Sequence, residues 1–385
     1  MKNNYRVCAT VDLEKIKNNL LQMENHIGKN KKIMAVVKAD AYGHGAVPVA
    51  RYLENLDFLW GFGVATIDEA VELRSAGIKK DILVFGCVFP EDYEDLITYD
   101  IIATIYTFET AKALNEIAQK KNHTLRAHIK VDTGMGRLGF APTKENAHLV
   151  ADIMKFSNLN IEGVFTHYAR ADEVDLGFTY GQHEKCLDFF DEIKKAIDNP
   201  HGENKKDLTY FHCSNSAGVI SYPSSACNIV RVGISMYGHY PSKEVAKDKV
   251  VLQPALRLTS HVSFVKEVPK GTPISYGGTF VTSKTTKVAT IPVGYGDGYP
   301  RSLSNIGDVL IDGVRCKILG RVCMDQFMVD VSHLPDVKIM DLVVLVGKMG
   351  NEEIKVEELS DLSGRFNYEF LCCLGKRIPR KYDNH

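Results

Sequence analysis

The sequence has no long apolar run, no block of like charge and no motif of paired cysteines. All apolar stretches are far shorter than the roughly 20 residues that cross a bilayer. There are 47 basic and 48 acidic residues, a formal net charge of −1, so neither nucleic acid nor a membrane is an expected partner. The N-terminus, MKNNYRVCATVDLEK, lacks the apolar core of a secretion signal. We therefore expect a cytoplasmic protein.

Cysteine usage also excludes some classes of protein. The nine cysteines, an odd number, include no C-x-x-C pair. This predicts reduced thiols rather than a disulfide framework or a zinc site, and we expect no bound metal. Most of the cysteines should be small core residues. The rest of the composition, with 45% hydrophobic and 25% charged residues, is typical of a globular protein.

Apolar runs alternate with segments of helical periodicity between residues 33 and 233. In TIDEAVELRSAG, Thr66 and Glu69 form a capping-box pair and Gly77 can end the helix. Such alternation predicts right-handed parallel crossovers, and eight units favour a (β/α)₈ barrel over a doubly wound open sheet. The eight predicted strands are Ile33–Lys38, Phe58–Ala65, Ile82–Gly86, Ile101–Tyr106, Leu125–Val131, Ile161–His167, Leu208–Cys213 and Asn228–Gly233.

The pattern changes after YGHYPSKEVAKDK, where β-branched segments become dominant and Gly/Asp turns separate several of them. We predict an α/β protein with a barrel over residues 1–245 and a mostly β domain over 246–385. The first ten or so residues could pack with the second domain. The predicted β segments are Leu256–Val268, Lys287–Val293, Val309–Ile311, Arg315–Leu319, Val322–Val331 and Leu342–Val346.

The segment MAVVKADAYGHG places Lys38 at the end of a run that reads as a strand buried on both faces. A lysine in such a place loses hydration, which lowers its pKa and makes the amine nucleophilic enough to form a Schiff base. Taken alone, this segment favours the alternative of a lysine in an ion pair at the end of a sheet.

Polar residues recur where the predicted strands end, which is the face of a barrel that carries chemistry. Each one has a structural explanation, such as an Asp132–Arg137 pair or a helix cap at Ser216. Together they indicate a site, because cationic groups would converge at one mouth without a structural need. These strand-end residues are Lys38, Lys130, Asp132, Arg137, His167, Ser216 and Arg231.

The loops after the seventh and eighth predicted strands are candidates for binding a phosphate. Barrels often hold a phosphate there on backbone N–H groups, and Ser216, Gly233 and Ile234 lie in these loops. An imine-forming lysine beside a phosphate site predicts pyridoxal 5′-phosphate as the cofactor. A sugar-phosphate aldolase, whose lysine would bind the substrate directly, is the competing interpretation.

Nine blocks of the sequence, in order from residue 35 to 372, resemble the bacterial alanine racemase family. They are AVVKADAYGHG, KVDTGMGRLGF, GVFTHYARADE, CSNSAG, VRVGISMYG, ISYGGTF, PVGYGDGYPR, GRVCMDQFMVDV and NYEFLC. The resemblance implies racemisation of alanine, with pyridoxal phosphate bound to Lys38. It also implies a homodimer with shared active sites that supplies D-alanine for peptidoglycan.

The resemblance implies a two-base mechanism, in which Lys38 and Tyr276 act on opposite faces of the substrate α-carbon. Tyr276 would come from the partner subunit. His167 would assist the tyrosine, whose phenol ordinarily ionises near pH 10. Arg231 would face the pyridine nitrogen, where an arginine can only donate a hydrogen bond. Such a contact keeps the nitrogen unprotonated and limits side reactions.

The resemblance also assigns residues that hold the cofactor and the substrate. Arg137 and the backbone N–H of Met324 would bind the substrate carboxylate, and Lys130 could be carbamylated so that it orients Arg137. Tyr295 and Tyr368 would narrow the entrance. The hydroxyls of Tyr42, Ser216 and Tyr368 would contact the cofactor phosphate near Gly233 and Ile234, and His167 and Asn215 would also bind the cofactor. Cys323 and Asp325 would line the pocket with Met324.

Three alternatives remain open. A serine or broad-specificity racemase would differ only modestly in its pocket. A decarboxylase of basic amino acids would place an acidic residue where this chain has Arg231. A non-catalytic barrel that binds the cofactor would lack the second domain and Tyr276.

Arg170 departs from the family pattern, where a smaller uncharged residue is expected.

Overall fold

The computed structural model describes residues 5–197, 208–222 and 226–383. The chain divides into two compact units. The β unit comprises Met1–Glu14, Tyr42–Gly45 and Pro254–His385, and the barrel unit comprises Lys15–Ala41 and Ala46–Gln253. Across the described residues, no helix has both the length and the apolar character needed to cross a bilayer.

Eight parallel strands form the barrel unit, in the order β4-β3-β2-β9 and β5-β6-β7-β8. A bridge between Leu83 and Ile102 joins β4 to β5, and Arg231 on β9 donates its N–H to the carbonyl of Ser214, which follows β8. The ring therefore closes, which confirms the predicted barrel. The strands are β2 (Lys32–Val36), β3 (Leu59–Val64), β4 (Asp81–Val84), β5 (Ala103–Ile105), β6 (Leu125–Lys130), β7 (Leu159–Phe165), β8 (Tyr210–His212) and β9 (Ile229–Val232).

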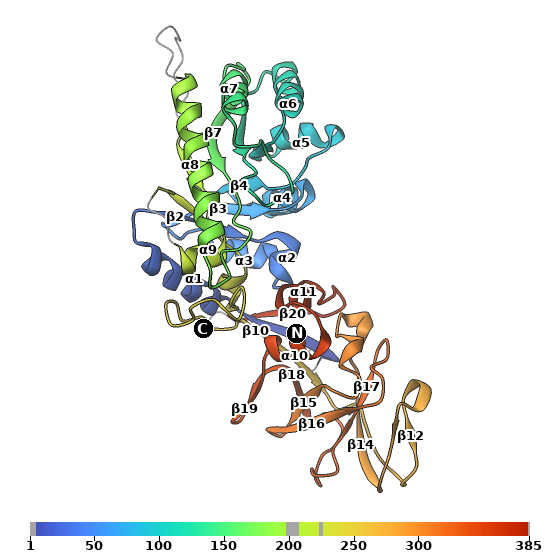
Figure 1. Ribbon diagram of the computed structural model, residues 1–385. Coiled ribbons are helices and arrows are strands. Elements are labelled where there is room, and N and C mark those ends of the chain that lie inside the picture. Colours follow the sequence, from blue (N-terminus) through green and yellow to red (C-terminus); the bar gives the residue numbers. More distant parts are fainter. Residues whose placement is uncertain (1–4, 198–207, 223–225, 384–385) are drawn as a thin grey trace. The chain divides into compact units, whose positions relative to one another are not determined.

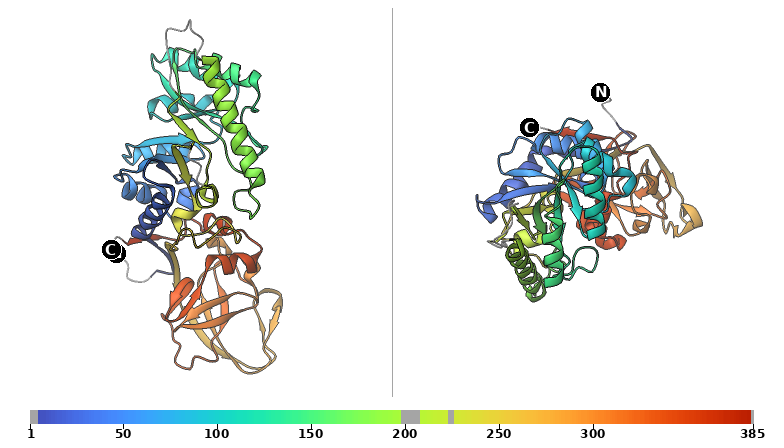
Figure 2. Two further views of the ribbon diagram at one scale, coloured as in Figure 1. Left: turned by 60° about the vertical axis from the view of Figure 1, so that its left-hand side comes forward. Right: turned by 90° about the horizontal axis from the view of Figure 1, so that it is seen from above.

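Helices alternate with these strands and surround them (Figure 1). The predicted capping box on α4 is present, because Thr66 accepts from the N–H of Glu69 while the Glu69 carboxylate accepts from the N–H of Thr66. Figure 2 shows α8 as the long green helix along one side of the barrel unit. The helices are α1 (Leu13–Ile27), α2 (Lys38–Tyr42), α3 (Ala46–Leu53), α4 (Ile67–Ser75), α5 (Tyr93–Thr98), α6 (Phe108–Lys120), α7 (Lys144–Ile153), α8 (Gly177–Ile197) and α9 (Ser216–Ser221).

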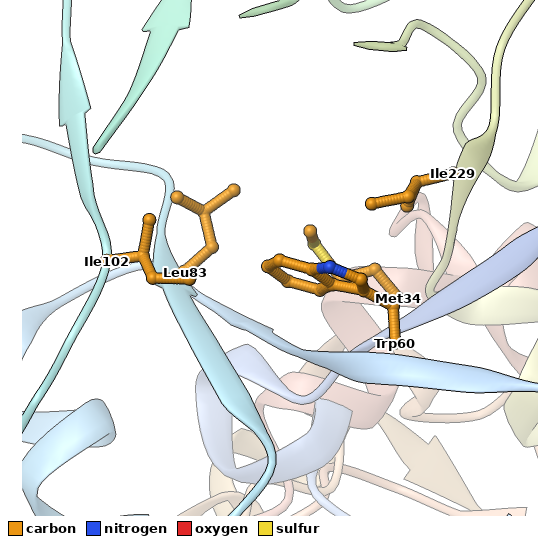
Figure 3. Packing of buried hydrophobic residues seen from close by; sticks show 5 residues of the cluster. All are labelled: Met34, Trp60, Leu83, Ile102 and Ile229. Atoms are coloured by element: carbon orange, nitrogen blue, oxygen red, sulfur yellow. The ribbon is translucent and has the colours of Figure 1, made fainter. Parts of the chain in front are cut away.

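Apolar side chains from neighbouring strands pack together in the barrel interior. Figure 3 shows Met34, Trp60, Leu83, Ile102 and Ile229 in this cluster, and each is at most 9% exposed. The ring of Trp60 packs edge-on against Tyr210, with 5.6 Å between centroids, and lies 5.7 Å from His128. The apolar cluster thus borders a polar layer within the same barrel.

The β unit contains a large, mostly antiparallel sheet in the order β11-β14-β17-β16-β15-β18-β10-β1-β20. The N-terminal strand β1 pairs with β10, and β20 runs parallel to β1. The strands and helices of this unit are β1 (Val7–Asp12), β10 (Leu256–His261), β11 (Phe264–Val268), β12 (Pro273–Ile274), β13 (Phe280–Val281), β14 (Thr286–Ile291), β15 (Asp308–Ile311), β16 (Val314–Leu319), β17 (Phe327–Asp330), β18 (Leu342–Met349), β19 (Glu352–Ile354), α10 (Val356–Ser363), α11 (Asn367–Cys372) and β20 (Arg380–Asp383).

Two predicted β segments are wrong in their extent. The segment 256–268 is not one strand, because β10 pairs with β18 whereas β11 pairs with β14, at a different part of the sheet. The segment 322–331 contains only one strand, β17. The backbone N–H of Cys323 donates to the carbonyl of Gln326, so the chain turns before this strand begins. No disulfide links any of the nine cysteines, all of which lie within the described ranges, and five of them are buried.

Candidate active site

The chain leaves β2 through an unusual turn that carries Lys38. Ala39, Asp40, Ala41 and Tyr42 have φ angles between 51° and 53°, so four consecutive non-glycine residues adopt the left-handed helical conformation. Such residues cost about 1–2 kcal/mol each, and a run of them persists only where other contacts hold it. Lys38 itself is half-buried at the start of this turn.

Three hydrogen bonds within the barrel unit hold the turn. The N–H of Ala41 bonds to the carbonyl of Val37 at 2.8 Å. The carboxylate of Asp40 accepts from the N–H of Ala46 at 2.8 Å, at the start of α3. Glu69 of α4 accepts from the N–H of Ala39 at 2.6 Å. The residue next to Lys38 is therefore tied to the loop that follows β3.

Arg231 on β9 lies 3% exposed in the barrel and is held by backbone carbonyls and imidazoles. Its guanidinium donates to the carbonyls of Thr166, His212 and Cys213 at 2.8–3.0 Å. It also contacts Nδ1 of His212 at 2.8 Å and Nδ1 of His167 at 3.4 Å. Among the described residues, none of these partners offers a carboxylate to Arg231. Burial lowers the pKa of the Arg231 guanidinium to about 10.

His167 marks the place where the predicted cationic residues converge. Its Nε2 lies 3.2 Å from the amide nitrogen of Asn215. Burial, followed by the charges of Arg231, Arg137, Lys38 and Lys130, keeps the pKa of His167 well below its ordinary value. Four predicted site cations of the barrel unit therefore act on this one imidazole.

The Asp132–Arg137 ion pair that the sequence allows is absent among the described residues, and Lys130 does not pair with Asp132 either. The ammonium of Lys130 donates to the carbonyl of Val131 at 2.7 Å, and burial with the nearby charge of Arg231 lowers its pKa to about 8. Asp132 instead accepts four backbone N–H groups, from residues 134–137, at 2.8–3.1 Å. The Arg137 side chain is exposed, and among the described residues its guanidinium has no hydrogen bond or ion pair.

The two loops proposed to hold the phosphate lie side by side. The hydroxyl of Ser216 accepts from the N–H of Gly233 at 2.9 Å. Gly233 precedes a short 3-10 helix, Ile234–Tyr237, whose first N–H groups lie at the same place. The helix cap of α9 is Asn215, which accepts from the N–H of Gly218, rather than Ser216.

Within the β unit, the predicted residues of the second face form another group. Tyr276 is 71% exposed and follows Ser275, whose φ is 66°. The hydroxyl of Ser275 donates to the carbonyl of Arg321 at 2.6 Å and lies 3.4 Å from Sγ of Cys323. These contacts join the Tyr276 turn to the Cys323–Gln326 turn.

A second loop packs against the same turn. The N–H of Tyr295 bonds to the carbonyl of Cys323, and Asp325 pairs with Arg377 at 2.7 Å. Met324 and Tyr295 are 53% and 42% exposed. Elsewhere in the β unit, the rings of Tyr42 and Tyr368 lie 5.9 Å apart.

Sequence reasoning missed a polar chain that runs from Arg231 through the barrel interior. His212 contacts His128 at 2.9 Å, and His128 lies 3.5 Å from Glu162. Glu162 pairs with Arg126 at 3.0 Å, and Arg126 pairs with Asp81. Burial lowers the pKa of His128 and His212. The sequence signal for this polar chain was the polar residues at alternate positions of LRAHIK, residues 125–130, a segment that is otherwise predicted to be an apolar strand.

Comparisons with known proteins show which family this chain belongs to. Residues 11–241 match the family model of the alanine racemase N-terminal domain, and residues 255–382 match that of the C-terminal domain. An alanine racemase of Halothermothrix orenii is 44% identical over 376 residues, which cover 98% of this chain and 96% of that protein. One from Methanococcus maripaludis is 43% identical over 381 residues, covering 98% and 99%.

Solved structures give the same result. The alanine racemase of Clostridium difficile 630 superposes with a TM-score of 0.92 at 37% identity, covering 99% of this chain and 97% of that one. The Bacillus anthracis enzyme with bound L-Ala-P gives 0.91 at 34% identity, covering 100% and 96%. Both domain models, the full-length relatives and the superposed folds lead to one conclusion: this chain belongs to the alanine racemase family.

Proposed function

We propose that this protein interconverts L- and D-alanine, using pyridoxal 5′-phosphate as its cofactor. The observation that carries the proposal is the convergence of Lys38, Arg137, Lys130 and Arg231 around His167. Membership of a family that depends on this cofactor supports it as well.

The donor set of the barrel unit fits the cofactor. Lys38 offers an amine for a covalent bond to the cofactor. The hydroxyl of Ser216, which accepts from the N–H of Gly233, can donate its own proton to a phosphate, and the first N–H groups of the 3-10 helix can donate as well. Arg231, which can only donate, suits an unprotonated ring nitrogen.

The bound cofactor would withdraw electrons from the substrate α-carbon, which makes the α-proton removable. Lys38 would exchange a proton at this carbon from one face and Tyr276 from the other, because inversion needs a base on each side. His167, kept uncharged by burial and by the cations around it, is suited to relay a proton from the phenol of Tyr276. These roles of the three residues are our proposal.

The substrate carboxylate would be held by the exposed guanidinium of Arg137 and by the backbone N–H of Met324. We propose that Lys130 is carbamylated, because its lowered pKa, about 8, leaves part of the amine neutral and able to react with carbon dioxide. The resulting anion would orient Arg137. Tyr295 and Tyr368 would restrict the site to a small side chain.

The exposure of Tyr276, Met324 and Tyr295 supports a homodimer with shared sites. Large side chains exposed together are typical of a surface that a partner covers. We propose that residues 246–385, the predicted mostly β domain, complete the active site of a second copy, with Cys323 and Asp325 beside Met324.

Mixing two inactive variants tests the shared site. Lys38→Ala and Tyr276→Phe should each lose racemisation, whereas dimers reformed from an equal mixture should recover roughly a quarter of the wild-type activity, since half of the dimers carry one intact site. No recovery, with hybrid dimers shown by mass spectrometry, would contradict sharing of Lys38 and Tyr276 between subunits.

The activity itself is tested by D-alanine formation from L-alanine, read with a D-amino-acid oxidase. Equal or faster conversion of L-serine would favour the broad-specificity alternative. A protein that binds the cofactor and converts neither would be the non-catalytic barrel.

We further propose that the enzyme acts in the cytoplasm and supplies D-alanine for peptidoglycan. The absence of disulfides among its nine cysteines suits a reducing compartment. Expression of the chain should let a bacterium that requires D-alanine grow without it, and failure of an active, soluble enzyme to do so would contradict this role.

A further inference from the structure

Four side chains that can bind soft metal ions meet behind the barrel strands, outside the residues assigned to catalysis. His183 and Cys186 lie three residues apart on α8, so they share a face of the helix. Cys213 directly follows β8, and Cys227 precedes β9. All four are buried, with exposed fractions between 0% and 4%.

The donor atoms of this cluster point toward one another. One ligand atom each of His183, Cys213 and Cys227 lies within 4.8 Å of the others. Cys186 is a fully buried thiol one helical turn from His183 on the same face of α8. Cys186 can therefore complete a set of three sulfurs and one nitrogen, a composition typical of structural zinc sites.

Neighbouring groups fix the imidazole. Nδ1 of His183 lies 2.8 Å from the hydroxyl of Tyr168, and the Tyr222 ring packs edge-on against it at 5.3 Å. Metal-binding histidines usually have such a second partner, which sets the ring orientation.

A buried cation lies next to this cluster. The carbonyl of Cys213 accepts from Arg231 at 2.8 Å. Arg231 is a buried cation whose partners among the described residues are uncharged.

We propose that His183, Cys186, Cys213 and Cys227 bind one thiophilic divalent ion of the Zn²⁺ class. Binding forms three metal–sulfur bonds and one metal–nitrogen bond, and three thiol protons leave to solvent. The complex carries a net charge of −1, which partly offsets the buried charge of Arg231. The linear spacing of these residues matches no zinc motif, which is why the sequence alone predicts no metal.

Cadmium titration of the chelator-treated holoenzyme tests the site. The exposed thiols are first removed by Cys87→Ser, Cys372→Ser and Cys373→Ser. Cd²⁺ should then produce the ultraviolet thiolate-to-metal absorbance, saturating at one ion per chain. The proposal is overturned if this absorbance does not saturate, or if it appears only when Cd²⁺ is in large excess over the protein.

Variants locate the ion. Cys227→Ala and His183→Ala should each lower the affinity for Cd²⁺ at least tenfold, whereas Cys8→Ala, a buried cysteine of β1, should leave it unchanged. An unchanged affinity for Cd²⁺ in Cys227→Ala contradicts the assignment. If these variants do not fold, zinc X-ray absorption of the wild-type holoenzyme decides: a shell dominated by sulfur supports the site, and a shell of oxygen and nitrogen alone overturns it.

Discussion

Glu69 accepts a hydrogen bond at 2.6 Å from the backbone N–H of Ala39, the residue that follows Lys38. The other carboxylate oxygen accepts from the N–H of Ala65 at 2.7 Å and from that of Thr66 at 3.4 Å. One side chain therefore links the end of β3, the start of α4 and the turn that carries Lys38. Glu69 acts as a positioning residue for that lysine.

We expect Glu69→Ala to loosen this turn. Hydrogen bonds to a charged acceptor contribute about 1.5–3 kcal/mol, so the free energy of unfolding should fall by about 2–3 kcal/mol. A misplaced Lys38 should lower kcat on the order of tenfold, with little change in KM. Urea unfolding and alanine racemisation measure the two effects.

Two variants serve as controls for Glu69→Ala. Glu69→Gln keeps an acceptor and should recover part of kcat. Glu72 is exposed on the same helix, so Glu72→Ala should leave the free energy of unfolding and kcat unchanged. Wild-type kcat in Glu69→Ala would show that Glu69 does not position Lys38.

Because Ala39 lies in the left-handed turn, replacing an alanine by glycine should have opposite effects on the free energy of unfolding there and inside a helix. Ala39 has a φ of 51°, so Ala39→Gly should raise the free energy of unfolding by about 1 kcal/mol, because glycine adopts this conformation without steric cost. Ala113→Gly, inside α6, should lower it by about 1 kcal/mol. Thermal or urea unfolding of both variants checks the signs, and a loss in both would argue against strain at Ala39.

The pKa of Lys130 predicts a pH dependence of stability. The pKa is lowered from 10.5 to about 8 in the folded state, so between these values the unfolded chain binds more protons and stability rises with pH. Below pH 8 the penalty is constant at about 3 kcal/mol, from about 1.4 kcal/mol per pH unit. Lys130→Met should therefore be more stable than wild type below pH 8, and this advantage should disappear toward pH 10.5.

Urea unfolding of the cofactor-free protein in buffer without carbon dioxide checks the Lys130 prediction, because carbamylation would remove the amine. An advantage of Lys130→Met that does not vary with pH would contradict it. Labelled bicarbonate should give the wild type, but not Lys130→Met, a carbamate signal in carbon NMR.

The polar chain behind Arg231 predicts the effect of His212→Phe. The ring of His212 stacks on Phe165 with 4.7 Å between centroids, and phenylalanine can keep this stack. It removes the acceptor for Arg231 and the partner of His128, which should cost about 1–3 kcal/mol of stability and weaken cofactor binding. His148→Phe, exposed on α7, is the control. Equal unfolding energies and cofactor absorbance in His212→Phe and wild type would exclude a role for this chain.

Local patterns in the sequence determine much of the fold. The eight barrel strands lie within a few residues of their predicted positions, because each is a short apolar run between helices with clear ends. The capping pair Thr66–Glu69 could be predicted because a cap depends on residues three positions apart. Chain order alone also places Lys38 after β2 and His167 after β7, and it places Arg231 on β9, the parallel neighbour of β2.

The tertiary structure decided what depends on residues far apart in the chain. The run of left-handed residues from Ala39 to Tyr42 has no local signature, since alanine and tyrosine disfavour it and only bonds such as Glu69–Ala39 hold it. Cys186, Cys213 and Cys227 likewise meet only because α8 packs over β8 and β9. Sequence spacing records neighbours along the chain, whereas strain and clustering depend on packing between elements, so only the folded barrel reveals them.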